Sequence, residues 1–211
     1  MSKSLYIYQR GEYDEGMHTY SEPVVLDSPQ HTSMHAATST VLFNLGQLYL
    51  RLNDHDEASS SFMRAMQIAQ WSGANEVSAS NSKKRQGASV MAILHNIGHV
   101  QYRSGCYEDA VRTYAKALQL GKTSFSKDSH KMLEVAATLN CLGVLYFHLP
   151  KAETEKAMEL YMESLAIRRA VLGADCESRE VATTLNNIGR IHYMKGEHDK
   201  ALDLYREALR M

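Results

Sequence analysis

Two histidines spaced four residues apart are the first candidates for chemistry in this sequence. On a helix, His95 and His99 would share one face, and this spacing lets two imidazoles bind one metal ion. A zinc hydrolase of this pattern needs Glu directly after the first His, but Asn96 stands there and no third ligand follows in a recognisable motif. His31 and His35 repeat the spacing, again without such a motif. We therefore expect His95 and His99 to line a groove, and we predict neither a metal nor a cofactor.

Cys141 is the candidate nucleophile. It follows Asn140, but a lone Cys on an otherwise apolar helix normally packs as a small apolar residue. The chain has no G-x-S-x-G, P-loop, G-x-G-x-x-G or D-x-D-x-D-G motif. We therefore predict a protein without enzymatic activity. An unrecognised enzyme or metal site around His95, His99 and Cys141 is the alternative that these residues leave open.

The overall composition indicates a folded helical protein. Hydrophobic residues make up 44% and charged residues 22% of the 211 positions, which excludes disorder along the whole length. The net charge of −1 provides no basic excess for phosphate binding, so we expect no nucleic-acid partner. The chain contains only three prolines, which favours an all-α fold.

The sequence also predicts the compartment. The N-terminus lacks the apolar segment of a secretory signal, and no apolar run is long enough to span a bilayer, so we expect no membrane partner. Cys106, Cys141 and Cys176 form no C-x-x-C pair, which argues against a disulfide framework and a structural zinc site. We expect a soluble, reduced, cytoplasmic protein.

The elements that position these residues come from an internal repeat. Four segments align on a glycine within an apolar stripe of helical spacing and on an alanine downstream, 12 residues later in three segments and 14 in the third. The glycines are Gly46, Gly98, Gly143 and Gly189, and the alanines are Ala58, Ala110, Ala157 and Ala201. We expect each glycine on a helix A and each alanine on a helix B, the two small residues meeting where the helices cross. Turns are expected at Asn53, Gly105 and Gly196, which tolerate left-handed backbone.

These segments resemble the tetratricopeptide repeat (TPR), a helix–turn–helix unit of about 34 residues. The periods are longer here, at 52, 45 and 46 residues between successive glycines. The run from Arg168-Arg169 to Leu172-Gly173, followed by Val181-Ala182 and Leu185-Asn186-Asn187, looks like the kinesin light chain type of TPR. Cys176-Glu177 departs from that type, which usually has His-Pro there. The resemblance implies an all-α, right-handed TPR superhelix (solenoid) of about four repeats, and it does not imply motor association.

The pattern divides the chain into an N-terminal segment and a repeat array. Residues 1–35 are expected to be irregular, with a degenerate half-repeat that acts as a cap. The array is expected over 36–211, with repeats at about 36–71, 87–122, 131–172 and 179–211, an exposed loop at 72–86 and a lengthened turn at Leu149-Pro150-Lys151. The last helix B reaches the end of the sequence. We therefore expect an exposed apolar end that pairs with another copy or continues into a longer array.

The A helices of stacked TPR units line a concave groove, and offsets from each glycine indicate which residues face it. No residue at these offsets is acidic, although acidic and basic residues balance over the whole chain. The predicted groove residues are Asn44, Gln47, Arg51, His95, Asn96, His99, Tyr102, Arg103, Asn140, Phe147, His148, Asn186, Asn187, Arg190 and Tyr193. Asn can donate and accept hydrogen bonds with a peptide backbone, and Arg forms bidentate bonds with carboxylates.

The resemblance to peptide-binding TPR domains implies that Asn44, Asn96 and Asn187 hold the main chain or carboxylate of a ligand. The alternative is that these side chains bond the neighbouring helix and fix the stacking of the repeats. The carboxylate clamp of chaperone-binding TPRs needs a Lys three residues before the first glycine, where this chain has Phe43. We therefore expect a scaffold or adaptor that binds an extended acidic or apolar-acidic peptide. A homo-oligomer stacked through the uncapped C-terminal repeat is a further alternative.

Overall fold

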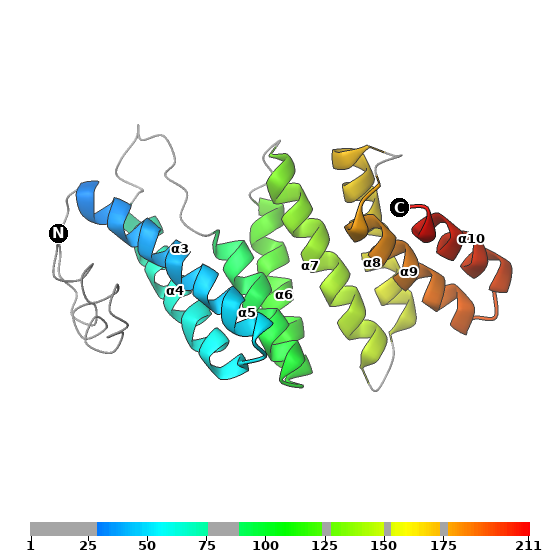
Figure 1. Ribbon diagram of the computed structural model, residues 1–211, viewed down its shortest axis with the longest axis horizontal. Coiled ribbons are helices and arrows are strands. Elements are labelled where there is room, and N and C mark those ends of the chain that lie inside the picture. The colour runs from blue at the N-terminus through cyan, green and yellow to red at the C-terminus, as the bar shows by residue number, and fades with distance from the viewer. Residues whose placement is uncertain (1–28, 76–88, 124–127, 150–152, 174–176) are drawn as a thin grey trace. The chain divides into compact units, whose positions relative to one another are not determined.

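The computed structural model describes residues 29–75, 89–123, 128–149, 153–173 and 177–211, and all regular structure in these ranges is α-helical (Figure 1). The chain divides into two compact units, Met1–Met34 and His35–Met211, and the features below belong to the second. The A helices are α3 (Pro29–Arg51), α5 (Val90–Arg103), α7 (Ser129–His148) and α9 (Arg179–Met194). The B helices are α4 (His55–Asn75), α6 (Tyr107–Thr123), α8 (Thr154–Leu172) and α10 (His198–Leu209). The predicted all-α solenoid of four helix pairs is confirmed.

Within each pair, an aromatic ring of helix B lies against the glycine of helix A. A Cβ atom at Gly143 would come within 2.6 Å of the Tyr161 ring, and one at Gly98 within 2.9 Å of the Tyr114 ring. The remaining pairs, Gly46 with Phe62 and Gly189 with Tyr205, repeat this contact. The predicted alanines are buried, but the ring four residues further along helix B is what touches the glycine. The missing side chain therefore makes room for the ring against the backbone of helix A.

The turns between helices A and B contain the left-handed residues that the sequence predicted. The φ angles are 59° at Asn53, 79° at Gly105 and 77° at Gly196. Gly and Asn adopt this conformation at low cost, so the chain reverses within a few residues and helix B folds back on helix A.

Two boundaries differ from the sequence prediction. Helix α3 begins at Pro29, so residues 29–35 are helical rather than irregular, because proline at the first helical position loses no hydrogen bond and has the required φ. Helix α4 continues to Asn75, and residues 72–75 are therefore not part of a loop. The remainder of the predicted loop and the predicted N-terminal cap lie outside the described residues.

The A helices α5, α7 and α9 form a continuous row. Helix α5 contacts α7 and α7 contacts α9, whereas the described B helices of neighbouring repeats meet through charged side chains, Lys122 of α6 with Glu163 of α8 and Arg169 of α8 with Glu207 of α10. Each of α4, α6 and α8 packs against the A helix that follows it. Arg168 on α8 is buried and donates hydrogen bonds to the carbonyl of Glu180 and the hydroxyl of Thr184 on α9. Through these hydrogen bonds, Arg168 links the third repeat to the fourth.

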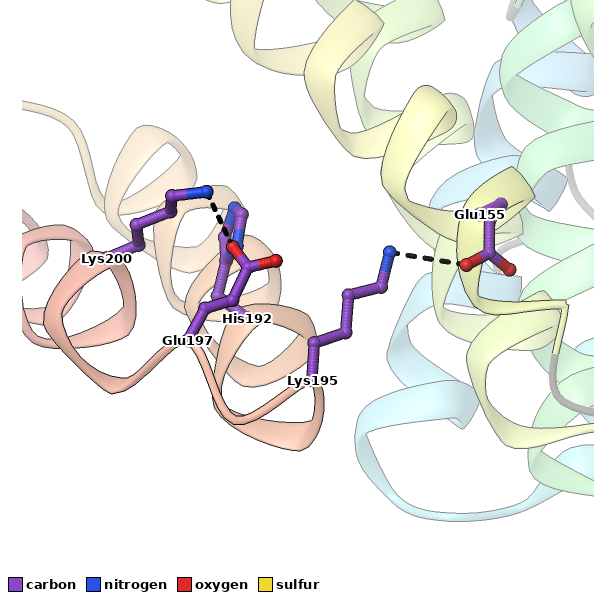
Figure 2. A network of polar contacts seen from close by, with 5 residues as sticks. All are labelled: Glu155, His192, Lys195, Glu197 and Lys200. Carbon is purple, nitrogen blue, oxygen red and sulfur yellow. Dashed lines mark hydrogen bonds and ion pairs between the residues drawn. The ribbon is translucent and has the colours of Figure 1, made fainter.

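A polar network holds the turn between α9 and α10 (Figure 2). His192 Nδ1 and Lys200 Nζ lie 2.9 Å and 2.8 Å from the same Glu197 oxygen, and Lys195 Nζ lies 3.3 Å from Glu155 at the start of α8. Hydrogen bonds from Lys200 and His192 lower the pKa of the Glu197 carboxyl. Because these pairs are largely exposed, they orient the last turn and add little stability.

None of the helices in the described ranges is long and apolar enough to cross a membrane.

Candidate functional site

The A helices carry little negative charge. Of the acidic residues in the eight helices, ten lie on B helices and only Glu134 and Glu180 lie on A helices, both within the first two turns. The later turns of the A helices therefore have basic, amide and aromatic side chains and no acidic one. We call the predicted groove residues that remain at least partly exposed there the A face, apart from His95 and Asn96, whose side chains bond within the protein. They are Asn44, Gln47, Arg51, His99, Tyr102, Arg103, Phe147, His148, Asn186, Arg190 and Tyr193.

In repeats three and four, the A face combines a cation with aromatic rings. The Arg190 guanidinium lies 4.7 Å from the centroid of the Phe147 ring, and the His148 ring meets the same Phe147 edge-on at 5.1 Å. Partial burial lowers the pKa of His148, and the nearby Arg190 charge lowers it further. Tyr193 follows one turn after Arg190 and is 61% exposed. This part of the A face offers a positive charge next to exposed apolar surface.

In repeats one and two, the A face contains two further positive groups, Arg51 and Arg103. Arg103 is exposed and donates a hydrogen bond of 2.8 Å to Asn53 Oδ1 in the turn of the first repeat. Burial lowers the pKa of His99, and the charges of Arg103 and His55 lower it further. The Tyr102 ring packs 5.8 Å from Tyr107. The positive charge at Arg103 is therefore held in place by the turn of the first repeat.

Three of the predicted asparagines serve the protein itself. Asn187 Nδ2 donates a 3.2 Å hydrogen bond to Asn140 Oδ1, and both residues are less than 10% exposed. Asn96 Nδ2 donates to the Ala92 carbonyl one turn earlier at 2.8 Å. Asn140 and Asn187 therefore bond the neighbouring helix, as the stacking alternative expects, and Asn96 bonds within its own helix. None of the three belongs to the A face. Asn44 is exposed, as expected of a ligand-facing amide.

His95 lies between repeats instead of facing a groove. The Thr138 hydroxyl donates to the Glu134 carbonyl at 2.9 Å, so it accepts the 3.0 Å hydrogen bond from Nδ1–H of His95. Burial lowers the pKa of His95 to about 4, and His99 adds to the shift. The imidazole is therefore neutral at pH 7 and is used in packing.

The His95–Thr138 pair belongs to a recurring contact that sequence reasoning missed. The residue three before the glycine of one repeat meets the residue five before the glycine of the next, and Asn140 lies 3.4 Å from Thr184 in the same way. The sequence feature that could have predicted this contact is a threonine at a helical position that is otherwise apolar, Thr138 on α7 and Thr184 on α9. Thr138 and Thr184 are both fully buried.

The alternative of an enzyme or metal site gains no geometric support from these residues. Cys141 lies on the same helix as Thr138, and burial raises the pKa of its thiol, which disfavours the reactive thiolate. His95 already bonds Thr138. Among the described residues, no group of three or more His, Cys, Asp or Glu side chains is arranged to hold a metal ion.

Helix–turn–helix pairs with this glycine–aromatic contact define a helical-repeat protein, and family comparison gives the class. Models of the tetratricopeptide repeat match residues 39–70, 93–127 and 134–211. The chain is a tetratricopeptide repeat protein. No curated protein sequence matches it.

Several solved structures share the fold. BtubC (BKLC) from P. vanneervenii is 21% identical with a TM-score of 0.64, and the match covers 98% of this chain and 76% of that one. The apo form of RapI is 17% identical with a TM-score of 0.65, covering 98% and 66%. The repeats of a putative kinesin light chain from Podosopora anserina are 13% identical with a TM-score of 0.52, covering 98% and 90%. At these identities the likeness concerns the fold alone.

Proposed function

We propose that this protein is a scaffold or adaptor whose A face binds an extended acidic peptide that also carries apolar side chains. The observation that carries this proposal is the charge segregation, with ten acidic residues on the B helices and two on the A helices. Burial lowers the pKa values of His99 and His148, and the charges of Arg103 and Arg190 lower them further, in keeping with positive charge at this face. A positive surface of this kind attracts carboxylates.

The two Arg groups define the expected contacts of the ligand. Arg103 and Arg190 would each bind a carboxylate through charge-assisted hydrogen bonds. Phe147 and Tyr102 provide apolar surface beside them, and Asn44 is available for the peptide backbone. Because an extended peptide loses much conformational freedom on binding, we expect a micromolar dissociation constant, which corresponds to a binding free energy of about −8 kcal/mol.

Fluorescence anisotropy tests the proposal with the full 211-residue chain. The probe is a fluorescein-labelled peptide rich in Asp, Leu and Phe, and the matched probe carries Asn in place of Asp. We expect the acidic probe to bind about tenfold more tightly or better, and Arg103→Gln and Arg190→Gln each to weaken it about tenfold. The control is Arg112→Gln on α6, whose side chain is 72% exposed on a B helix. Equal affinity for the two probes, or equal effects of all three substitutions, would refute the proposal.

We infer that binding at this face involves no chemical step, because the buried His95 and the protonated Cys141 are poorly suited to act as base and nucleophile. Location in the cytoplasm remains a prediction.

A further inference from the structure

The three arginines of the A face lack an acidic partner. No described carboxylate forms an ion pair with Arg51, Arg103 or Arg190. By contrast, several arginines of the B helices each pair with a carboxylate, namely Arg112, Arg169 and Arg206. A ligand with carboxylates would supply the partners that the A-face arginines lack.

Two of these arginines stand two A helices apart, Arg103 on α5 and Arg190 on α9, with α7 between them. The Arg103 guanidinium donates a hydrogen bond to Asn53 in the turn of the preceding repeat. The Arg190 guanidinium lies over the ring of Phe147, which also belongs to the preceding repeat. Because both side chains lean in the same direction along the row of A helices, their charged ends stay about two helix spacings apart.

This separation determines which residues of one extended peptide can reach both arginines. Packed helices lie about 8–10 Å apart, so the two guanidinium groups are separated by about 16–20 Å. An extended peptide advances about 3.3 Å per residue, so side chains six residues apart are separated by about 20 Å and side chains four residues apart by only about 13 Å. A separation of five residues would place the two side chains on opposite sides of the peptide. Six residues is therefore the separation that fits.

We propose that the A face selects peptides by the spacing of their acidic residues, binding two carboxylates six residues apart, one at Arg103 and the other at Arg190. This selection rests on the function proposed above and adds a rule for the sequence of the ligand. A peptide that already bonds one arginine meets the second at a high effective concentration, so the correct spacing raises affinity without any new type of contact.

The rings beside the two arginines define the apolar positions of the ligand. The Phe147 ring is half-buried, and its centroid lies 4.7 Å from the Arg190 guanidinium. Tyr102 precedes Arg103 on α5 and is also half-buried. A residue two places inside each acid lies on the same side of the peptide, about 7 Å from that acid, and can contact these rings. The expected order is acid, x, apolar, x, apolar, x, acid, which is the same in both chain directions.

Fluorescence anisotropy of the full chain with two labelled probes of equal composition tests the spacing. The matched probe is Asp–Ser–Leu–Ser–Leu–Ser–Asp. The mismatched probe is Asp–Ser–Leu–Asp–Leu–Ser–Ser, in which the second Asp moves to the fourth place and both Leu residues stay where they are. Each probe is also made with Asn in place of Asp, which measures the preference for acids independently of their spacing.

Arg103→Gln and Arg190→Gln are the decisive variants. Each should weaken the matched probe about tenfold, so that the two losses multiply to about a hundredfold. The mismatched probe cannot reach both arginines at once, and Arg51, about 10 Å from Arg103 in the first repeat, offers one of its acids another partner. Its two losses should therefore multiply to about tenfold or less. Arg112→Gln on α6 is the control that should leave both probes unchanged, and circular dichroism verifies that each variant is folded.

The outcomes separate the spacing rule from the proposed function. A product of about a hundredfold for the mismatched probe, or of about tenfold or less for the matched probe, would overturn the spacing rule. A preference for the Asp probes over their Asn versions would still support the proposed function in that case. If neither Asp probe bound more tightly than its Asn version, the proposed function and the spacing rule would both be wrong.

Discussion

The buried His95 makes the stability of the repeat array sensitive to mild acid, and an asparagine from the next repeat supplies the matched comparison. Asn140 occupies the equivalent place three residues before its glycine and lies opposite Thr184 as His95 lies opposite Thr138. His95→Asn therefore keeps a side-chain donor for the Thr138 hydroxyl and removes the titrating group. The perturbation is this substitution combined with a change of pH.

The size of the effect follows from the pKa of His95, which falls from an ordinary 6.5 to about 4 in the folded protein because of burial and the neighbouring His99. Between these values the unfolded chain binds a proton that the folded protein excludes, so the free energy of unfolding decreases as pH falls. Full stability is present above about pH 6.5, and His95 alone removes about 2 kcal/mol by pH 5.

Urea unfolding followed by circular dichroism measures this loss at about pH 7.5 and about pH 5. The parent should lose about 2 kcal/mol more than His95→Asn over this interval, whatever the stability of each at the higher pH. His99 and the surface carboxylates titrate in both proteins, so their effects largely cancel in the difference. An equal loss in parent and variant would show that His95 is not the group responsible.

Two further predictions concern packing within and between repeats. Gly143→Ala should lower the free energy of unfolding by about 2 kcal/mol or more, because its Cβ would stand 2.6 Å from the Tyr161 ring. Gly105→Ala, in open space at a φ of 79°, should cost only about 1 kcal/mol, and urea titrations that rank the two in the opposite order would contradict this account. Arg168→Ala should cost about 2–4 kcal/mol because the buried guanidinium bonds Glu180 and Thr184. Hydrogen exchange should accelerate first in α9, and unchanged protection there would mean that Arg168 does not fasten the fourth repeat.

The sequence predicted the features that depend on local chemistry. The anchor glycines, the buried alanines and the left-handed turns at Asn53, Gly105 and Gly196 lie where the pattern placed them, because each depends on residues within one helix pair. The aromatic ring above each glycine was not predicted. The small alanine suggested the closest contact, whereas the ring four residues later reaches further.

The roles of the polar residues on the A helices were harder to predict. Asn140, Asn187 and His95 have the same residue types and offsets as ligand-binding positions, and a single helix does not reveal which of them the next repeat covers. Whether a polar side chain is covered depends on the residues of the next repeat, here Thr138 opposite His95 and Thr184 opposite Asn140. Arg168 was noticed only as part of a motif, since its partners lie on the following helix.

The positive charge on the acid-free later turns of the A helices also affects how fast partners meet, because the B helices carry nearly balanced charges. A molecule with positive charge on one side turns in the field of a charged partner before contact, so an acidic partner approaches the A side more often than chance allows. This orientation acts over a distance of about 10 Å at an ionic strength of 0.1 M and weakens as salt is added. The arrangement of charges therefore sets an association rate as well as an affinity.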